Sequence, residues 1–256
     1  MIKITNNTYY IAECAIHVKG ENYLLCNSPF TSFQTPVAYR SEMDLLISVA
    51  DFPLDIKFTN IVELESICVG RSVHGDWIFS EKDQYLCLIE ADTDCSHLRG
   101  FISKKDIELT TIGDQFLQLL RVAAECHLSH HGCISLHASC VCLHGQSVLF
   151  SAPSGTGKST HANIWQQSFE AEILSGDRPL ICVDSDRVFA HGVPWDGKEQ
   201  IFLQKSKPVI AIVDLHRATD NWMRVMSEGQ AFRMLLKQSF LPMWDDEAKM
   251  SAVEMA

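Results

Sequence analysis

Residues 147–160 read SVLFSAPSGTGKST, and this stretch decides the fold that we expect for the chain. The apolar run 147–151 has the composition of a buried strand, the segment 152–159 is rich in glycine, and residues 161–168 are compatible with a helix. A strand, a glycine-rich loop and a helix in this order form the context of a Walker A phosphate-binding loop. A turn of the same composition that binds no ligand is the alternative.

The residue types in this loop suit phosphate binding. Successive backbone N–H groups form a concave anion site, and the N-terminus of the following helix adds a partial positive charge. Gly155 and Gly157 allow backbone conformations that a Cβ atom would block. Lys158 can reach the outer phosphates, and the hydroxyl of Ser159 can coordinate Mg²⁺. We therefore predict that ATP and Mg²⁺ bind at Ser154, Gly155, Thr156, Gly157, Lys158, Ser159 and Thr160.

Composition narrows the class of protein. The chain has 256 residues, of which 46% are hydrophobic and 21% charged, as expected for a globular protein with a proper core. Its net charge of −11 argues against nucleic acid or an anionic membrane as a partner, because both attract clustered Lys and Arg. Ten cysteines without a recognisable export signal predict reduced thiols in a cytoplasmic protein. A homo-oligomer is compatible with this composition.

The pattern along the chain changes near residue 110. Residues 1–110 predict a smaller β-rich domain that contains one short helix at 41–50, since apolar residues recur there at helical spacing. Residues 111–256 predict the nucleotide-binding domain, introduced by a helix that starts at Thr110 and stops before Gly132. Further helices are expected at 227–238 and from 242 onward. Short strands are expected at 133–141, 147–151, 172–174, 180–183, 187–191 and 209–215.

The block from Leu136 to Thr160 resembles the HPr kinase/phosphorylase and phosphoenolpyruvate carboxykinase superfamily. In that superfamily a histidine begins a strand upstream of the loop lysine, as His137 does here. The segment Gly176-Asp177-Arg178 is similar to the Asp-Asp-Arg of HPr kinase, and residues 192–199 resemble a downstream segment of HPr-kinase-like proteins. The resemblance covers residues 112–240. It implies an α/β fold: a P-loop kinase core with a mixed sheet and flanking helices.

The resemblance also implies an activity, which is phosphorylation of a serine-type hydroxyl in a peptide, protein or small molecule. Three departures bear on it. Ala152 replaces the first loop glycine, Gly176 replaces the first aspartate of the pair, and the relatives are expected to have one more strand beyond Ala256. Since the first aspartate would be the base in HPr kinase, Asp177 is expected to act alone here.

Each candidate residue has both a structural and a functional interpretation. Asp177 follows an apolar strand, so its carboxylate can coordinate Mg²⁺ and accept the proton of the nucleophile, or simply belong to a surface turn. His137 is a catalytic candidate next to the transferring phosphate, or a structural strand histidine. Arg178 and Lys198 could contact phosphate, and Glu199 could be a metal ligand. These three could equally form surface ion pairs.

The segment from Cys126 to Cys133 looks like a metal cluster. His127 and His131 are four residues apart and would share a helix face, which gives half of a zinc site. Histidines are also favoured at the negative C-terminal end of a helix. Because no second ligand pair has suitable spacing, we predict that these histidines hold no structural metal.

The expected function is ATP- and Mg²⁺-dependent transfer of the γ-phosphoryl group to a hydroxyl. Lys158 and the loop would hold the phosphates, Ser159, Asp177 and Glu199 the metal, and His137 would contact the transferring group. Two alternatives remain: a nucleotide-binding regulator that transfers nothing, which the absence of the first aspartate favours, and carboxykinase chemistry, which the small number of arginines disfavours. A second carboxylate near Gly176, such as Asp184 or Glu199, would favour the kinase over the regulator.

Overall fold

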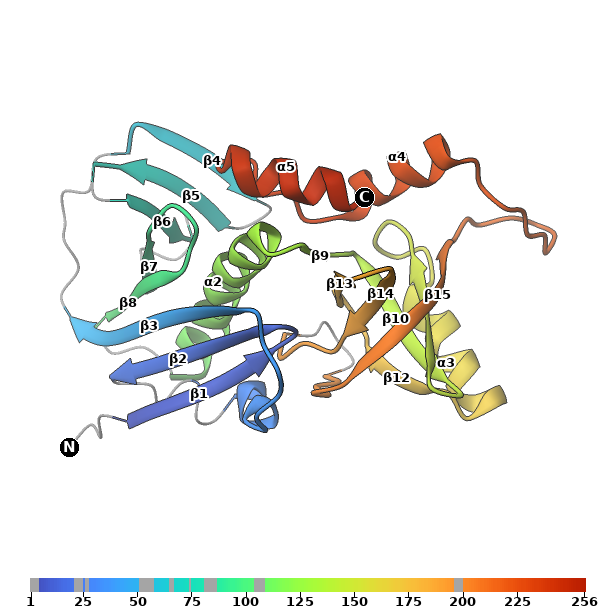
Figure 1. Cartoon of the computed structure of the whole chain (residues 1–256), viewed down its shortest axis with the longest axis horizontal. Coiled ribbons are helices and arrows are strands. Elements are labelled where there is room, and N and C mark those ends of the chain that lie inside the picture. The colour runs from blue at the N-terminus through green and yellow to red at the C-terminus, as the bar shows by residue number, and fades with distance from the viewer. Residues whose placement is uncertain are drawn as a thin grey trace. The chain divides into compact units, whose positions relative to one another are not determined.

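The computed structural model describes residues 5–20, 25, 28–50, 58–64, 67–73, 75–80, 87–103, 109–195 and 200–256. The chain divides into two compact units. The first consists of Met1–His131 and Pro242–Lys249, and the second of Gly132–Leu241 and Met250–Ala256. Each unit is built on one large β-sheet (Figure 1).

The first unit contains an eight-stranded mixed sheet in the order β1-β2-β3-β8-β7-β6-β5-β4. Strand β3 is parallel to both of its neighbours, and the other strand pairs are antiparallel. Helix α2 (Leu109–His130) contacts β6 and β7, and its Phe116 is fully buried over Gly100 of β8. The elements are β1 (Thr5–Ile11), β2 (Cys14–Gly20), η1 (Pro29–Phe33), β3 (Ser41–Ala50), β4 (Asn60–Leu64), β5 (Ile67–Ser72), β6 (Gly75–Phe79), β7 (Cys87–Ala91) and β8 (His97–Ser103).

The helix predicted at 41–50 is wrong, because this segment is strand β3. Its buried residues alternate with exposed ones: Met43, Leu45 and Ile47 point into the core, while Leu46 is 48% exposed. The helical spacing depended on counting Leu46 as a core residue. A strand between two parallel neighbours instead shows the period of two.

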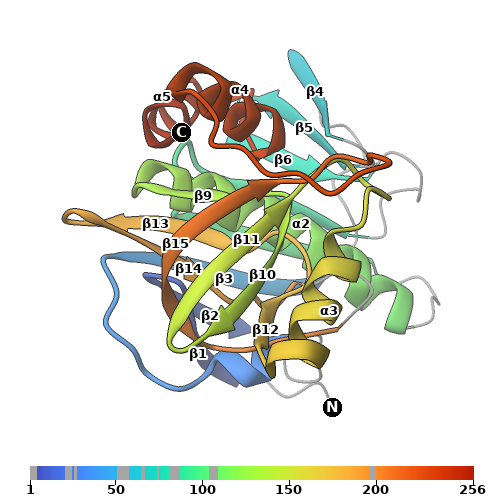
Figure 2. The ribbon, with the colours of Figure 1, turned by 90° about the vertical axis from the view of Figure 1, so that its right-hand side faces the viewer.

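The second unit contains a seven-stranded sheet in the order β12-β10-β11-β15-β14-β13-β9. Figure 2 shows β10, β11 and β15 side by side, with α3 against this part of the sheet. Apolar residues from both sheet faces form two clusters, one around Leu149 and Leu174 and one around Phe150 and Ile173. The elements are β9 (Cys133–Ser135), β10 (Ala138–Leu143), β11 (Gln146–Ser151), α3 (Lys158–Phe169), β12 (Glu172–Ser175), β13 (Leu180–Asp184), β14 (Arg187–His191), β15 (Ser206–Asp214), α4 (Glu228–Gln238) and α5 (Asp246–Met255).

The predicted α/β fold with a P-loop kinase core is wrong. Among the described residues, 42% lie in strands and 27% in helices, so the protein is mostly β. In the second sheet, β11 and β15 are the one parallel pair among the described strands, and the other neighbours are antiparallel. The strand–loop–helix motif is present locally, but it does not dictate how the remaining strands pair, and an α/β core needs repeated helical crossovers between parallel strands. Within the described ranges, no helix combines the length and apolar character needed to cross a lipid bilayer.

The prediction that all thiols are reduced also differs from the structure. Cys133 of β9 and Cys182 of β13 lie opposite each other in an antiparallel pair and form a disulfide. Seven other cysteines of the described ranges form no disulfide, and all seven are buried. Opposite residues in an antiparallel pair can lie close enough for a disulfide, but a separation of 49 residues in sequence does not reveal that pairing.

Candidate functional site

Four strand ends of the second sheet meet at one edge. Strand β10 is antiparallel to β11 and β12, and β11 is parallel to β15. The carboxyl ends of β11, β12 and β15 therefore lie at the same edge as the amino end of β10. The residues at or next to these ends are His137, the glycine-rich loop, Asp177 and Asp214. This edge is the candidate functional site.

The glycine-rich loop connects β11 to α3 in a conformation that depends on glycine. Gly155 has φ of 75° and Gly157 has φ of 125°, in the region that L-residues with a Cβ atom rarely adopt. Ala152 is not among the residues with positive φ, so alanine is tolerated at that position. The departure from the usual motif therefore costs the loop no backbone strain.

The N-terminus of α3 is open to an anion. Its N-cap is Gly157, which provides no side-chain cap, and no acidic residue lies in the first turn. The first N–H groups of a helix lack partners within the helix and attract negative charge. Lys158 and the half-buried Ser159 occupy the first two helical positions. The helix end thus combines backbone donors, a cation and a hydroxyl.

Three residues predicted to be catalytic lie together at this edge. Lys158 Nζ lies 2.8 Å from His137 Nε2 and donates a hydrogen bond to the Ala152 carbonyl at 3.1 Å. The distance from His137 Nε2 to Asp177 Oδ1 is 3.7 Å, which is too long for a hydrogen bond. Lys158 belongs to α3, His137 directly precedes β10, and Asp177 lies in the turn after β12.

His137 is held in its neutral form. Burial lowers its pKa below the ordinary value, since it disfavours the imidazolium, and the positive charges of Lys158 and Arg178 lower it further. The carboxylate of Asp177 acts in the opposite direction without reversing the shift. A neutral imidazole can accept the proton that Lys158 donates to Nε2, so the contact and the electrostatics agree.

The turn that carries Asp177 is fixed by hydroxyl groups. Ser139 donates a hydrogen bond to the Gly176 carbonyl at 2.8 Å, and Ser175 donates one to the Asp177 carbonyl at 2.8 Å. Arg178 has a left-handed backbone with φ of 52°, which costs a residue other than glycine about 1 kcal/mol. Asp177 Oδ1 is buried and has no hydrogen-bond partner among the described residues. A buried carboxylate oxygen without a donor suits coordination of a cation.

Sequence reasoning missed the residues at the end of β15. Asp214 lies opposite Ser151 in the parallel pair, next to the start of the glycine-rich loop. Its Oδ2 lies 2.9 Å from His216 Nε2, and Arg217 donates a hydrogen bond to the Gly155 carbonyl. The run of apolar residues 209–213 that ends in Asp214 is the pattern that could have revealed it. In P-loop NTPases an aspartate on such a neighbouring strand holds Mg²⁺.

One carboxylate considered in the sequence analysis, Asp184, is not brought to this edge. Asp184 is exposed at the far end of β13, about 13 Å along the strand from Leu180, so it does not replace the carboxylate absent at Gly176. Lys198 and Glu199 lie outside the described residues. The second carboxylate that the structure does place at the edge is Asp214.

No family model matches the sequence, and no curated protein matches it.

Proposed function

We propose that this protein binds Mg-ATP at the glycine-rich loop and transfers the γ-phosphoryl group to a serine-type hydroxyl. The observation that carries the proposal is the convergence of Lys158, His137 and Asp177 at the sheet edge from which the loop starts. Phosphoryl transfer requires charge neutralisation and in-line positioning more than covalent chemistry by the protein. A cation, a neutral imidazole and two carboxylates around open backbone donors meet that requirement.

Each residue has a role in this reaction. Lys158 and the N–H groups of the loop bind the β- and γ-phosphates, and Lys158 exchanges its contact with His137 for the phosphate oxygens. The acceptor oxygen attacks the γ-phosphorus, and the bond from that phosphorus to the β–γ bridging oxygen breaks. ADP leaves with the electron pair. Asp177 accepts the hydroxyl proton, and Arg217 lies beside the loop where negative charge moves onto the leaving group.

The residues present fit a magnesium ion. Ser159, the buried Oδ1 of Asp177 and the carboxylate of Asp214 are the hard oxygen donors that Mg²⁺ prefers. When bound, Mg²⁺ neutralises charge on the phosphate oxygens. Because Asp214 can hold the metal, Asp177 can act as the base even though Gly176 provides no carboxylate.

The decisive experiment incubates the protein with γ-labelled ATP, Mg²⁺, free serine and a panel of serine-bearing peptides, and detects phosphoserine by mass spectrometry. We expect labelled phosphoserine from wild type. We expect a loss of 10²–10⁴-fold in Asp177→Asn, as removal of a positioned base typically gives. Equal product from Asp177→Asn would refute its assignment as the base.

A nucleotide-binding regulator is the second candidate, and the observation in its favour is Gly176, which leaves Asp177 without the paired carboxylate. A regulator would bind Mg-ATP as tightly as the enzyme and transfer phosphate to no acceptor. Mg-ATP binding by calorimetry, combined with no product across the panel, would establish the regulator in place of the kinase.

A further inference from the structure

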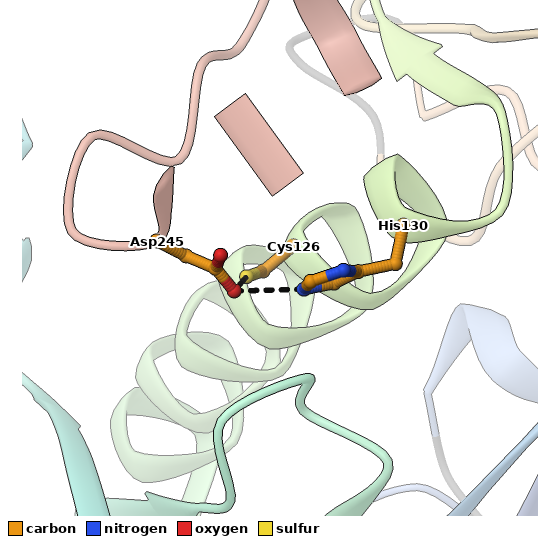
Figure 3. Close-up of side chains that lie close together, drawn as sticks. All are labelled: Cys126, His130 and Asp245. Atoms are coloured by element: carbon orange, nitrogen blue, oxygen red, sulfur yellow. Dashed lines mark hydrogen bonds and ion pairs between the residues drawn. The ribbon is translucent and has the colours of Figure 1, made fainter. Parts of the chain in front are cut away.

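Outside the candidate site, three side chains of the first unit place ligand atoms within 4.8 Å of one another: Cys126, His130 and Asp245 (Figure 3). Cys126 and His130 are four residues apart and project from one face of α2. Asp245 directly precedes α5 and is 119 residues from Cys126 in sequence. Cys126 is fully buried, and the side chains of His130 and Asp245 are 10% and 4% exposed.

Two of the ligand atoms lie close to the third, which is a carboxylate oxygen. Asp245 Oδ2 lies 2.7 Å from His130 Nε2 and 3.8 Å from Cys126 Sγ. In a tetrahedral zinc site, nitrogen and oxygen ligands lie about 3.3 Å apart, and sulfur and oxygen ligands about 3.5 Å apart. The observed distances approach this geometry, and a shift of about 0.6 Å between His130 and Asp245 would open the centre.

The surroundings orient Asp245 toward the other two residues. Its Oδ1 accepts a hydrogen bond from the Ala248 N–H at 3.0 Å and caps α5, which directs Oδ2 to Cys126 and His130. A ligand oriented by a second interaction is typical of protein metal sites. The carboxylate therefore has its direction fixed before any ion binds.

A neighbouring contact holds α2 in place at the cluster. His127 Nδ1 lies 3.1 Å from the Asp94 carbonyl, which fixes this end of α2 to the turn between β7 and β8.

The cluster places a carboxylate beside a thiol and an imidazole, which suits a cation. Cysteine binds zinc as the thiolate, so the Cys126 thiol would release its proton as the metal–sulfur bond forms.

We propose that Cys126, His130 and Asp245 bind a zinc ion. A thiolate, an imidazole and a carboxylate form a donor set that suits zinc better than magnesium or calcium. The three ligands come from α2 and from the residue before α5, so the ion would tie the end of α2 to the start of α5. This site differs from the His127/His131 pair that the sequence singles out.

The test measures zinc in protein purified without a His tag or chelator. We expect about one zinc per chain in wild type and its loss in Cys126→Ser and in Asp245→Asn. Asp245→Asn is the decisive variant if Cys126→Ser misfolds, because asparagine also caps helices and preserves side-chain volume. His131→Ala and Cys142→Ser are the matched controls and should retain the metal.

Cobalt substitution identifies the ligands directly. Co²⁺ added to metal-free wild type should give the visible bands of a tetrahedral site and a thiolate-to-cobalt charge-transfer band, which Cys126→Ser should abolish. The proposal is overturned if metal-free wild type binds neither ion in competition with a chromophoric chelator. It is equally overturned if Asp245→Asn and Cys126→Ser both retain zinc, or if His131→Ala loses it.

Discussion

At the scale of single residues, the position of Lys158 bears on the proposed phosphate binding. Its side chain is largely buried, and its ammonium contacts the neutral imidazole of His137 and the carbonyl of Ala152. A neutral imidazole accepts a hydrogen bond from the ammonium without adding a second positive charge beside it. The neutral state of His137 is therefore part of the proposed binding arrangement.

Replacing Lys158 tests this directly. Lys158→Ala removes the cation that faces the outer phosphates, and we expect Mg-ATP affinity to fall at least tenfold, equivalent to about 1.4 kcal/mol. Isothermal titration calorimetry is the measurement. Lys205→Ala is the control, because Lys205 pairs with Glu172 at the opposite end of β12. Equal Mg-ATP affinity in Lys158→Ala and wild type would contradict the phosphate-binding role proposed for the loop.

The sequence predicted some site residues and missed others for a physical reason. Short motifs fix local geometry, so Lys158, His137 and Asp177 could be chosen from spacing and resemblance. Asp214 reaches the same edge only because β15 pairs in parallel with β11, and Asp245 reaches Cys126 only through tertiary packing. Both depend on contacts between segments far apart in the sequence, which a single sequence does not specify.

At the scale of elements, prediction was good where the pattern was long or bounded by turns. The helix expected from Thr110 to Gly132 is α2, and the helices and most of the strands expected around the loop are present with shifts at their ends. The single strand expected at 133–141 is wrong, because this segment forms two strands: β9 pairs with β13, and β10 pairs with β11 and β12. The segment 41–50 failed because short apolar runs have nearly equal helical and extended interpretations until their neighbours are known. Pairing with neighbouring strands in the sheet makes this segment a strand.

The packing of α2 on the first sheet depends on one glycine. A Cβ atom at Gly100 of β8 would lie 2.7 Å from the ring of the fully buried Phe116. We expect Gly100→Ala to lower the free energy of unfolding by about 1–3 kcal/mol, as overpacking of a core does. Urea denaturation measures the change. In a Phe116→Leu background the same substitution should cost less, and an identical cost in both backgrounds would show that the ring is not what limits the space.

At the scale of the whole molecule, composition predicted a globular protein with a proper core, but not its class. A phosphate-binding motif is most familiar in α/β proteins, so the motif led to a wrong expectation for the sheets. The antiparallel hairpins β10–β11 and β13–β14 require only short turns, and each contributes strands without a helix between them. The sequence therefore predicted the local motif, but not how the strands of the two sheets pair.

Composition also predicted the wrong redox state for the cysteines, and this state can be measured on the whole molecule. The Cys133–Cys182 disulfide closes a loop with a sequence separation of 49 residues, and the loop-entropy model assigns such a crosslink up to about 4 kcal/mol of stability. We expect a reductant to shift the urea unfolding midpoint of wild type downward and to leave that of Cys133→Ala/Cys182→Ala unchanged. In denaturant with a chelator, unreduced wild type should show two fewer reactive thiols than its ten cysteines. Ten reactive thiols, together with an unfolding midpoint that does not respond to reductant, would show that the chain is fully reduced, as its composition suggested.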